Sequence, residues 1–500
     1  MALQDLIERL PLHASPALTP LSALLLLFAT YIIYRSFLDP LSNIPGPLIC
    51  KLTYLWDWYH SYLGDESKQI DVLHAKYGPV VRIGPKDVVI ADGAALAPIY
   101  SEKGGFRKAP CYANFDSEGH ATIFSALDPK HRAVRSKAVM PMFSTANIRA
   151  RSDAIEGCID NMIYRLKQEA EESRRAKKET GVAPPVDVLN LSRGLAIDAV
   201  SNYLFGKDYG AISEKSSKMS ASTYVDSIVI FGRLFFLPPW LFVPLIMAYE
   251  RFFPNPEVGA SSDKVNSFTN PLAEDCPEHE DTYQSRLLKA GCSVHEADVQ
   301  MKDVIFAGTD TTGTNLGTIL FQLAKHPHSY RELQQEIKAA EQEDPNYNPS
   351  NLKYLDAVIR EGLRTSLANP TRFPRLVPPT GLTFTANNGC TYHLPPGATV
   401  GLSPYTLHFN PKVFSDPTAF KPERWLNGPT PEMYRDFIPF GLGPRQCIAR
   451  NLASMELTLA VRAVAKSNVL EGARPVKDKL EVYEWFNAKV KGERIDLVWD

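Results

Sequence analysis

The sequence predicts a mainly α-helical protein with small β-sheets and an N-terminal transmembrane helix. Three observations support this class: an uncharged apolar segment near the N-terminus, long stretches with helical spacing of apolar residues, and one pair of β-branched runs. Of the 500 residues, 44% are hydrophobic and 22% charged, which is enough material for a large core. No internal repeat or long low-complexity linker divides the chain, so we expect one large domain over residues 48–500.

Composition excludes two classes of site. A net charge of -2 and a pI near 6.6 give no basic footprint for nucleic acid. The seven cysteines are scattered and show neither CxxC nor Cys/His spacing, which argues against a disulfide framework and against a zinc site. We interpret six of them as small buried residues and return to Cys447 below.

The first element is an expected membrane anchor over residues 18–35. Residues 18–34 carry no charge and Arg35 closes them, a length just sufficient for the roughly 30 Å hydrocarbon core of a bilayer. A cleaved signal peptide is the alternative, but no basic segment precedes the apolar run within residues 1–17 and no small-residue cleavage site follows it. The slight excess of Lys and Arg after the span favours a cytosolic body.

Four segments that follow have distinct patterns. Residues 36–47 contain three prolines and predict a short, semi-rigid extended connector. Residues 80–92 hold two β-branched runs around Gly-Pro and predict a hairpin. Residues 171–184 are rich in charge and predict a solvated surface loop. Residues 228–247 are strongly apolar but contain Arg233 and Pro238-Pro239, so they predict a membrane-dipping or substrate-gating element, with a buried helix pair as the alternative.

Residues 306–314, "FAGTDTTGT", interrupt a long helical pattern. The apolar stripe around them is formed by Met301, Ile305, Leu316, Ile319 and Leu323. Each glycine costs a helix interior roughly 1 kcal/mol relative to alanine, and Thr and Asp compete for backbone hydrogen bonds. Such a local weakness inside a long helix is typical of a site where chemistry needs an irregularity.

Residues 439–450, "PFGLGPRQCIAR", predict an irregular loop followed by a helix that Cys447 opens. Free backbone N–H groups and the helix dipole at that position favour a thiolate, the form that binds a soft metal. Arg445 is always charged and suits a carboxylate of a ligand against the loop. From these local features, a metal ligand and an activated nucleophile are both open.

The run Phe440-x-x-Gly443-x-Arg445-x-Cys447 resembles the haem-binding loop of the cytochrome P450 family. The resemblance implies that Cys447 is the axial ligand of the haem iron and that Phe440, Gly443 and Arg445 bind the cofactor. The family usually has glycine where this chain has Ala449. A thiolate ligand favours O–O cleavage, the reaction an oxygenase needs.

Further motifs follow in the order of that family. "EGLR" and "FKPERW" supply Glu361, Arg364 and Arg424, which resemble a buried charge network with a structural role. The haem propionates are expected to meet further cations in addition to Arg445, and the positions that resemble the family's are His131, Arg135 and Arg375.

"AGTDTT", residues 307–312, resembles the oxygen-activating segment of the family's central helix. Ala307 and Gly308 are expected to leave space above the iron, and Thr311 to hold the oxygen and hydrogen-bond back to residue 307. Asp310 is expected to relay protons. We expect the helix to be kinked there.

The resemblance implies the family's fold and a haem-thiolate monooxygenase. Its cofactor would be haem b, and its reaction the insertion of one O2-derived oxygen atom by hydroxylation, epoxidation or further oxidation. Electrons would come from NADPH through a cytochrome reductase, because too few residues follow Cys447 for a flavin domain. The anchor and the haem loop resemble microsomal fungal members, which implies an endoplasmic reticulum location and a lipophilic substrate of secondary metabolism. Two alternatives are a haem-thiolate isomerase or dehydratase that needs no O2, and a non-catalytic haem sensor.

Overall fold

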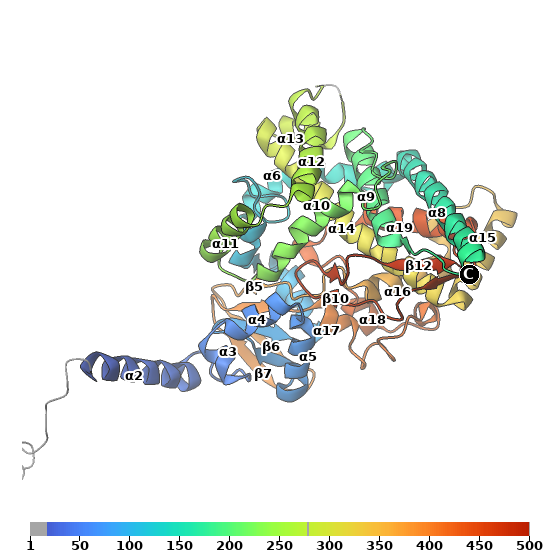
Figure 1. The fold of residues 1–500 in the computed structure, drawn as a ribbon. Helices are drawn as coiled ribbons and strands as arrows, with labels where there is room; N and C mark the ends of the chain where they lie inside the picture. Colours follow the sequence, from blue (N-terminus) through green and yellow to red (C-terminus); the bar gives the residue numbers. More distant parts are fainter. Residues whose placement is uncertain (1–17, 278–279, 500) are drawn as a thin grey trace, which may run out of the picture.

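Helices dominate the computed structural model, which describes residues 18–277 and 280–499 (Figure 1). The α-helices are α2 (Leu18–Ile33), α3 (Leu48–Leu52), α4 (Leu55–Leu63), α5 (Glu66–Tyr77), α6 (Pro129–Val139), α7 (Thr145–Ala150), α8 (Ser152–Thr180), α9 (Val188–Phe205), α10 (Ser220–Val229), α11 (Pro239–Phe252), α12 (Pro256–Glu274), α13 (Tyr283–Lys289), α14 (Val294–Lys325), α15 (Pro327–Glu343), α16 (Lys353–Ser366), α17 (Pro404–His408), α18 (Pro431–Asp436) and α19 (Arg450–Lys466). The expectation for residues 1–17 lies outside the described residues.

Helix α14 runs through the centre of the helical part, packed against α9, α16 and α19 (Figure 1). Ser293 caps its start, because the side chain accepts a hydrogen bond from the Glu296 backbone N–H. The helix is unbroken through residues 306–314, so the weak helix formers do not end it. Tertiary packing supplies the stability that local propensity lacks, because α14 is mostly buried along its length.

Within the described residues, the strands form four small sheets. They are β1 (Val80–Arg82), β2 (Asp87–Ile90), β3 (Arg107–Lys108), β4 (Val186–Asp187), β5 (Arg375–Leu376), β6 (Leu382–Thr385), β7 (Thr391–Leu394), β8 (Thr399–Gly401), β9 (Ala473–Pro475), β10 (Val482–Tyr483), β11 (Lys489–Val490) and β12 (Asp496–Trp499). The largest sheet has the order β1-β2-β8-β5-β3, and its β1–β2 pair confirms the predicted hairpin. In the β3–β5 pair Lys108 lies opposite Arg375, which brings two cations together.

Two sequence expectations about loops are wrong. Most of residues 171–184 continue α8, which ends at Thr180, because long charged side chains suit an exposed helix face as well as a loop. The connector over residues 36–47 is not extended. A π-helical turn, Tyr34–Leu38, continues α2 and bends follow it. Leu41 and Ile44 are then buried in the body.

The apolar N-terminal helix and α11 both expose apolar side chains. Residues Pro20–Leu38 are long and apolar enough to cross a membrane and are almost wholly unburied, and Figure 1 shows α2 projecting from the body. Helix α11 has no buried residue, and Trp240 and Met247 are exposed. The alternative of a buried helix pair over residues 228–247 is therefore wrong for α11.

Candidate active site

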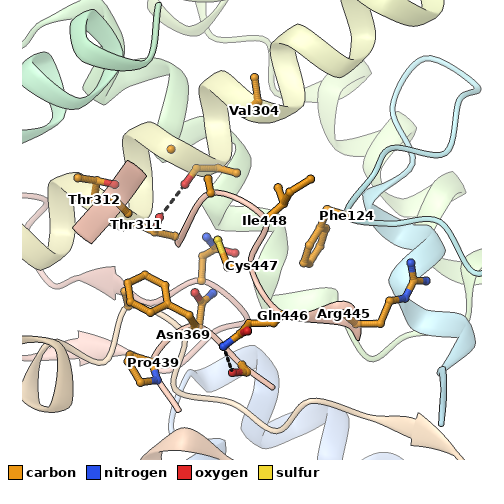
Figure 2. A pocket seen from close by; sticks show the side chains of 18 of the residues that line it. Phe124, Val304, Thr311, Thr312, Asn369, Pro439, Arg445, Gln446, Cys447 and Ile448 are labelled. Carbon is orange, nitrogen blue, oxygen red and sulfur yellow. Dashed lines mark hydrogen bonds between the residues drawn. The ribbon is translucent and has the colours of Figure 1, made fainter. Parts of the chain in front are cut away.

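One deep cavity brings together the segments that the sequence singled out. It is lined by α14, by the loop before α19, and by residues from α6, β3 and β5. Figure 2 shows Thr311 of α14 and Cys447 of the loop bordering the same space, with Arg445 further along the loop. Phe440 and Arg375 also line it.

The loop that carries Cys447 depends on backbone contacts. Gly443 has φ 73° and a Cβ there would lie 1.8 Å from the Tyr100 carbonyl oxygen, so only glycine fits. Gly443 does not line the cavity, and it acts by setting the path of the loop backbone. The Cys447 N–H donates to the Phe440 carbonyl at 2.9 Å, which closes the loop.

Cys447 precedes its helix and does not open it as expected, because α19 begins at Arg450. Cys447 lines the cavity, and its side chain is accessible from it. Burial raises the pKa of the Cys447 thiol, and the Ala449 N–H and Arg450 only partly oppose this. The surrounding protein groups therefore favour the thiol, whereas coordination to a metal ion deprotonates a thiol. Ala449 has φ -92°, which alanine adopts without strain.

Four cations line one part of the cavity: Lys108, Arg132, Arg375 and Arg445. Burial lowers the pKa of Arg445 to about 10, and Arg132 and Arg375 add to this effect. Burial also holds the pKa of Lys108 well below its ordinary value, again with the three arginines adding to it. Basic side chains that repel one another in a buried site call for an anionic ligand, which would favour their charged forms.

The structure does not bring His131 or Arg135 to the cavity. His131 Nε2 lies 3.1 Å from the Ala121 carbonyl oxygen, and Arg135 is ion-paired with Glu296. Arg132 of the same helix lines the cavity. The rotation of α6 about its axis decides which side chain faces inward, and here it turns Arg132 toward the cavity.

The haem implied by the resemblance fits the residues of this cavity. Arg445 Nη1 is buried and has no hydrogen-bond partner among the described residues, although Nη2 donates to the Ala126 carbonyl. A carboxylate would satisfy Nη1, and the two propionates of haem would offset part of the four-cation charge. Cys447 supplies the soft ligand.

The α14 wall of the cavity contains Ala307, Gly308 and Thr311. Ala307 is open to the cavity, and the Thr311 hydroxyl donates to the Ala307 carbonyl at 2.8 Å, as predicted (Figure 2). A Cβ on Gly308 would lie 2.8 Å from Val200 Cγ2, so this glycine also lets α9 approach α14 closely. Gly308 therefore allows close packing of the two helices, in addition to the open space that we expected it to leave.

Asp310 points away from the cavity into a buried charge network. It accepts from Arg193 Nη2 at 3.1 Å and from Asn487 Nδ2 at 2.8 Å, and Asn487 lines the cavity. Arg193 also pairs with Asp226 at 3.0 Å, and Lys218 pairs with Asp226 at 2.9 Å. Burial works to lower the pKa of Arg193, but the two aspartates outweigh burial and raise it. These ion pairs connect Asp310 through Arg193 and Asp226 to Lys218, whose side chain is 41% exposed and therefore reaches the surface.

Glu361, Arg364 and Arg424 meet in one buried cluster, as the sequence indicated. Arg364 Nη2 lies 2.8 Å and Arg424 Nε 2.9 Å from Glu361 Oε1. Glu361 and Arg364 are fully buried. None of the three lines the cavity, which is consistent with a structural role.

Two acidic residues that the sequence analysis missed also line the cavity, Asp303 and Glu456. Asp303, Ala307 and Thr311 have i, i+4, i+8 spacing, so helical periodicity could have placed Asp303 on the cavity face. Glu456 interrupts an apolar stripe of α19 between Leu452 and Leu459, and a charged residue in such a stripe is a recognisable signal.

The sequence and the fold are similar to those of known proteins. The family model "Cytochrome P450" matches residues 45–467. "Cytochrome P450 monooxygenase mfmF" of Annulohypoxylon moriforme is 38% identical over 97% of this chain and 99% of that protein. "Cytochrome P450 monooxygenase atnE" of Emericella nidulans is 28% identical over 88% of each chain. A crystal structure of a cytochrome P450 superposes with a TM-score of 0.67 at 16% identity, over 87% of this chain and 94% of that one, and supports the fold alone.

Proposed function

Because the chain belongs to the cytochrome P450 family, we propose that it oxidises a lipophilic small molecule in fungal secondary metabolism. The chain is a haem-dependent monooxygenase, since both the family and the monooxygenase names of its relatives support this class. The observation that carries the proposal is Cys447, which is open to a cavity shared with Thr311 and the four cations. Hydroxylation, epoxidation and further oxidation all belong to this reaction class.

In this proposal Cys447 ligates the haem iron, and Lys108, Arg132, Arg375 and Arg445 hold the propionates. When bound, the haem supplies the activated oxygen atom, and thiolate ligation favours O–O cleavage. Phe440 lines the cavity beside the ligand and helps to exclude water from it. The apolar part of the lining, which includes Phe124 and Val304, suits a lipophilic substrate.

Thr311 and Asp310 are the proposed proton-handling residues. The Thr311 hydroxyl borders the cavity and can hold oxygen or water there by a hydrogen bond. Asp310 relays protons to the cavity side, to which its contact with Asn487 gives it access, and a chain of ion pairs from Arg193 through Asp226 to the partly exposed Lys218 holds its carboxylate in place. Each link joins side chains within hydrogen-bonding distance.

We place the protein at the endoplasmic reticulum membrane, with the catalytic body in the cytosol. The apolar helix α2 serves as a single-pass anchor in this proposal, and the exposed apolar face of α11 touches the same bilayer. Electrons come from NADPH through a cytochrome reductase in that membrane. The apolar helix α2, the fungal relatives and the resemblance of the anchor and haem loop to microsomal members of the family support this arrangement.

The experiment begins with the carbon monoxide difference spectrum of the reduced protein, which reports thiolate ligation. A spectrum without the thiolate signature contradicts the proposal. Purified reductase, NADPH and 18O2 then test for incorporation of one labelled oxygen atom into product. Asp310→Asn and Thr311→Ala are expected to lose product while haem binding remains. Substrates are found by screening lipophilic compounds for a low-spin to high-spin shift.

The two alternatives are not favoured. Relatives across 88% or more of the chain are named monooxygenases, and an isomerase or dehydratase could dispense with an acid and alcohol at residues 310 and 311. Product formation that continues without O2 would support an isomerase or dehydratase, and haem binding without any turnover would support a sensor.

A further inference from the structure

A second pocket, separate from the active-site cavity, lies between α4 and residues 230–237, and we call it the α4 slot. Its volume is about 300 Å³, and it shares no lining residue with the cavity. Apolar and aromatic side chains form most of its wall, including Leu55, Tyr59 and Phe236. Among the described residues that line it, Arg233 alone is charged. An apolar slot with a single cation suits a ligand that has an apolar chain and an anionic group.

Arg233 brings a positive charge to the slot without a counter-charge. It pairs with no carboxylate in the described part of the chain, and its buried Nε atom has no hydrogen-bond partner there. Its guanidinium carbon lies 5.0 Å from the Tyr62 ring centroid and 4.5 Å from that of Trp485, and these cation–π contacts hold it. The buried indole N–H of Trp58, which also lines the slot, likewise lacks an acceptor among the described residues. Unpaired N–H donors beside a cation favour an anionic acceptor.

The slot belongs to the part of the body nearest the anchor. Helix α4 packs against α3, and α3 packs against the π-helical turn that continues α2 (Figure 1). Leu55, Tyr59 and Tyr62 of the slot wall are more than half exposed. Helix α11, which follows residues 230–237 in the chain, exposes Trp240 and is the helix that we place against the bilayer. The exposed apolar wall of the slot is therefore continuous with the proposed membrane contact, which makes bilayer lipid its nearest source of apolar chains.

We propose that the α4 slot binds an anionic phospholipid of the bilayer. One acyl chain packs against Leu55, Leu234 and Leu237, and the phosphate accepts hydrogen bonds from Arg233 and from the Trp58 indole N–H. Phosphatidylcholine carries the same phosphate, but its choline group places a second positive charge near Arg233, so a headgroup with net negative charge binds better. This inference rests on the membrane location proposed above.

The competing explanation is a general attraction between basic side chains and an anionic membrane. Arg233→Gln removes the charge from the slot. Arg251→Gln is the matched control, because Arg251 is exposed on α11 and does not line the slot. Leu55→Trp fills the slot from its exposed wall and keeps Arg233, so it tests the slot even if Arg233→Gln folds poorly. All three variants are first checked for haem content and thermal stability.

The first measurement needs no bilayer. Thermal unfolding of the haem-loaded full chain is followed in neutral detergent micelles with dioctanoyl phosphatidylserine or dioctanoyl phosphatidylcholine. For wild type and Arg251→Gln, phosphatidylserine at about 100 times its Kd is expected to raise the unfolding midpoint by about 2–3 °C, because it binds the folded state. Arg233→Gln and Leu55→Trp are expected to lose this rise. Equal rises with the two lipids, or an unchanged rise in Arg233→Gln, overturn the inference.

The second measurement asks whether bilayer lipid fills the slot. The full chain is reconstituted in phosphatidylcholine vesicles that contain a trace of phosphatidylserine or phosphatidylcholine with a photoactivatable acyl chain, and mass spectrometry locates the labelled peptides. We expect phosphatidylserine to label α4 and residues 230–237 roughly tenfold more than phosphatidylcholine in wild type and Arg251→Gln, but not in Arg233→Gln. Labelling that is absent from these peptides, or equal for the two headgroups, overturns the inference. If the chain does not bind vesicles at all, the proposed membrane location fails instead, and the micelle result still reports on the slot.

Discussion

The buried charge network around Glu361 allows a sharp test of the structural role proposed for it. The Glu361 carboxylate accepts five hydrogen bonds: two from Arg364, one from Arg424, one from Trp425 Nε1 and one from the Lys421 N–H. Glu361→Gln keeps the shape, removes the charge and turns an NH2 group toward donors. Arg364, which is 0% exposed, would then lack a counter-charge.

The expected cost of Glu361→Gln follows from burial. Breaking a buried ion pair while one partner remains typically costs about 3–5 kcal/mol. The three bonds from arginine are charge-assisted, and weakening each by about 1 kcal/mol gives a similar sum. The matched control is Asp356→Asn on the same helix, because Asp356 pairs with Arg360 at 2.6 Å but its side chain is 54% exposed and that of Arg360 is only half-buried. A pair of that kind is worth at most about 0.5 kcal/mol.

The assay is urea unfolding of the haem-loaded protein, followed by circular dichroism and by the carbon monoxide spectrum of the reduced form. We expect Glu361→Gln to lower the free energy of unfolding by about 3–5 kcal/mol and to release haem early in the transition. Asp356→Asn is expected to match wild type. If the two variants differ by less than about 1 kcal/mol, burial does not set the strength of this network and the reasoning is refuted.

Three further predictions concern the cavity. Arg132→Ala is expected to speed haem transfer to apomyoglobin about tenfold or more, since one charge-assisted contact is lost. The control, His131→Ala, is expected to leave the transfer rate near that of wild type. Faster transfer in His131→Ala than in Arg132→Ala would show that His131 binds the haem propionates, as the sequence predicted. Gly308→Ala is expected to destabilise the protein by about 1–3 kcal/mol in thermal unfolding, because its Cβ would lie 2.8 Å from Val200 Cγ2, and an unchanged effect in a Val200→Ala background would show that this contact is not the cause. Because the pKa of Glu456 is raised to about 8 in the folded protein from an ordinary value of 4.5, the folded state holds a proton that the unfolded state releases, and stability is lost as pH rises between these values. In urea unfolding at pH 5 and pH 9, Glu456→Gln is therefore expected to gain stability relative to wild type at the higher pH. A stability difference that does not depend on pH would contradict the raised pKa of Glu456.

The sequence by itself determined the features that depend on local spacing. The Phe440–Cys447 run fixed the family, and four-residue spacing placed the Thr311 hydroxyl on the Ala307 carbonyl. The Glu361 and Arg364 contact follows from i, i+3 spacing on α16. A hairpin over residues 80–92 was predictable because β-branched runs around Gly-Pro have few other arrangements.

Only the tertiary structure decided which neighbours distant segments acquire. Which face of α6 points inward depends on how the helix packs, and this selects Arg132 over His131. The partner of Asp310 is Arg193, 117 residues earlier in the chain, and no local pattern encodes that contact. Glu456 and Thr312 are likewise far apart in sequence, and the packing of α19 beside α14 brings them together. Local spacing constrains a side chain within one helix, whereas the rotation and docking of whole helices are fixed by the global packing of the core.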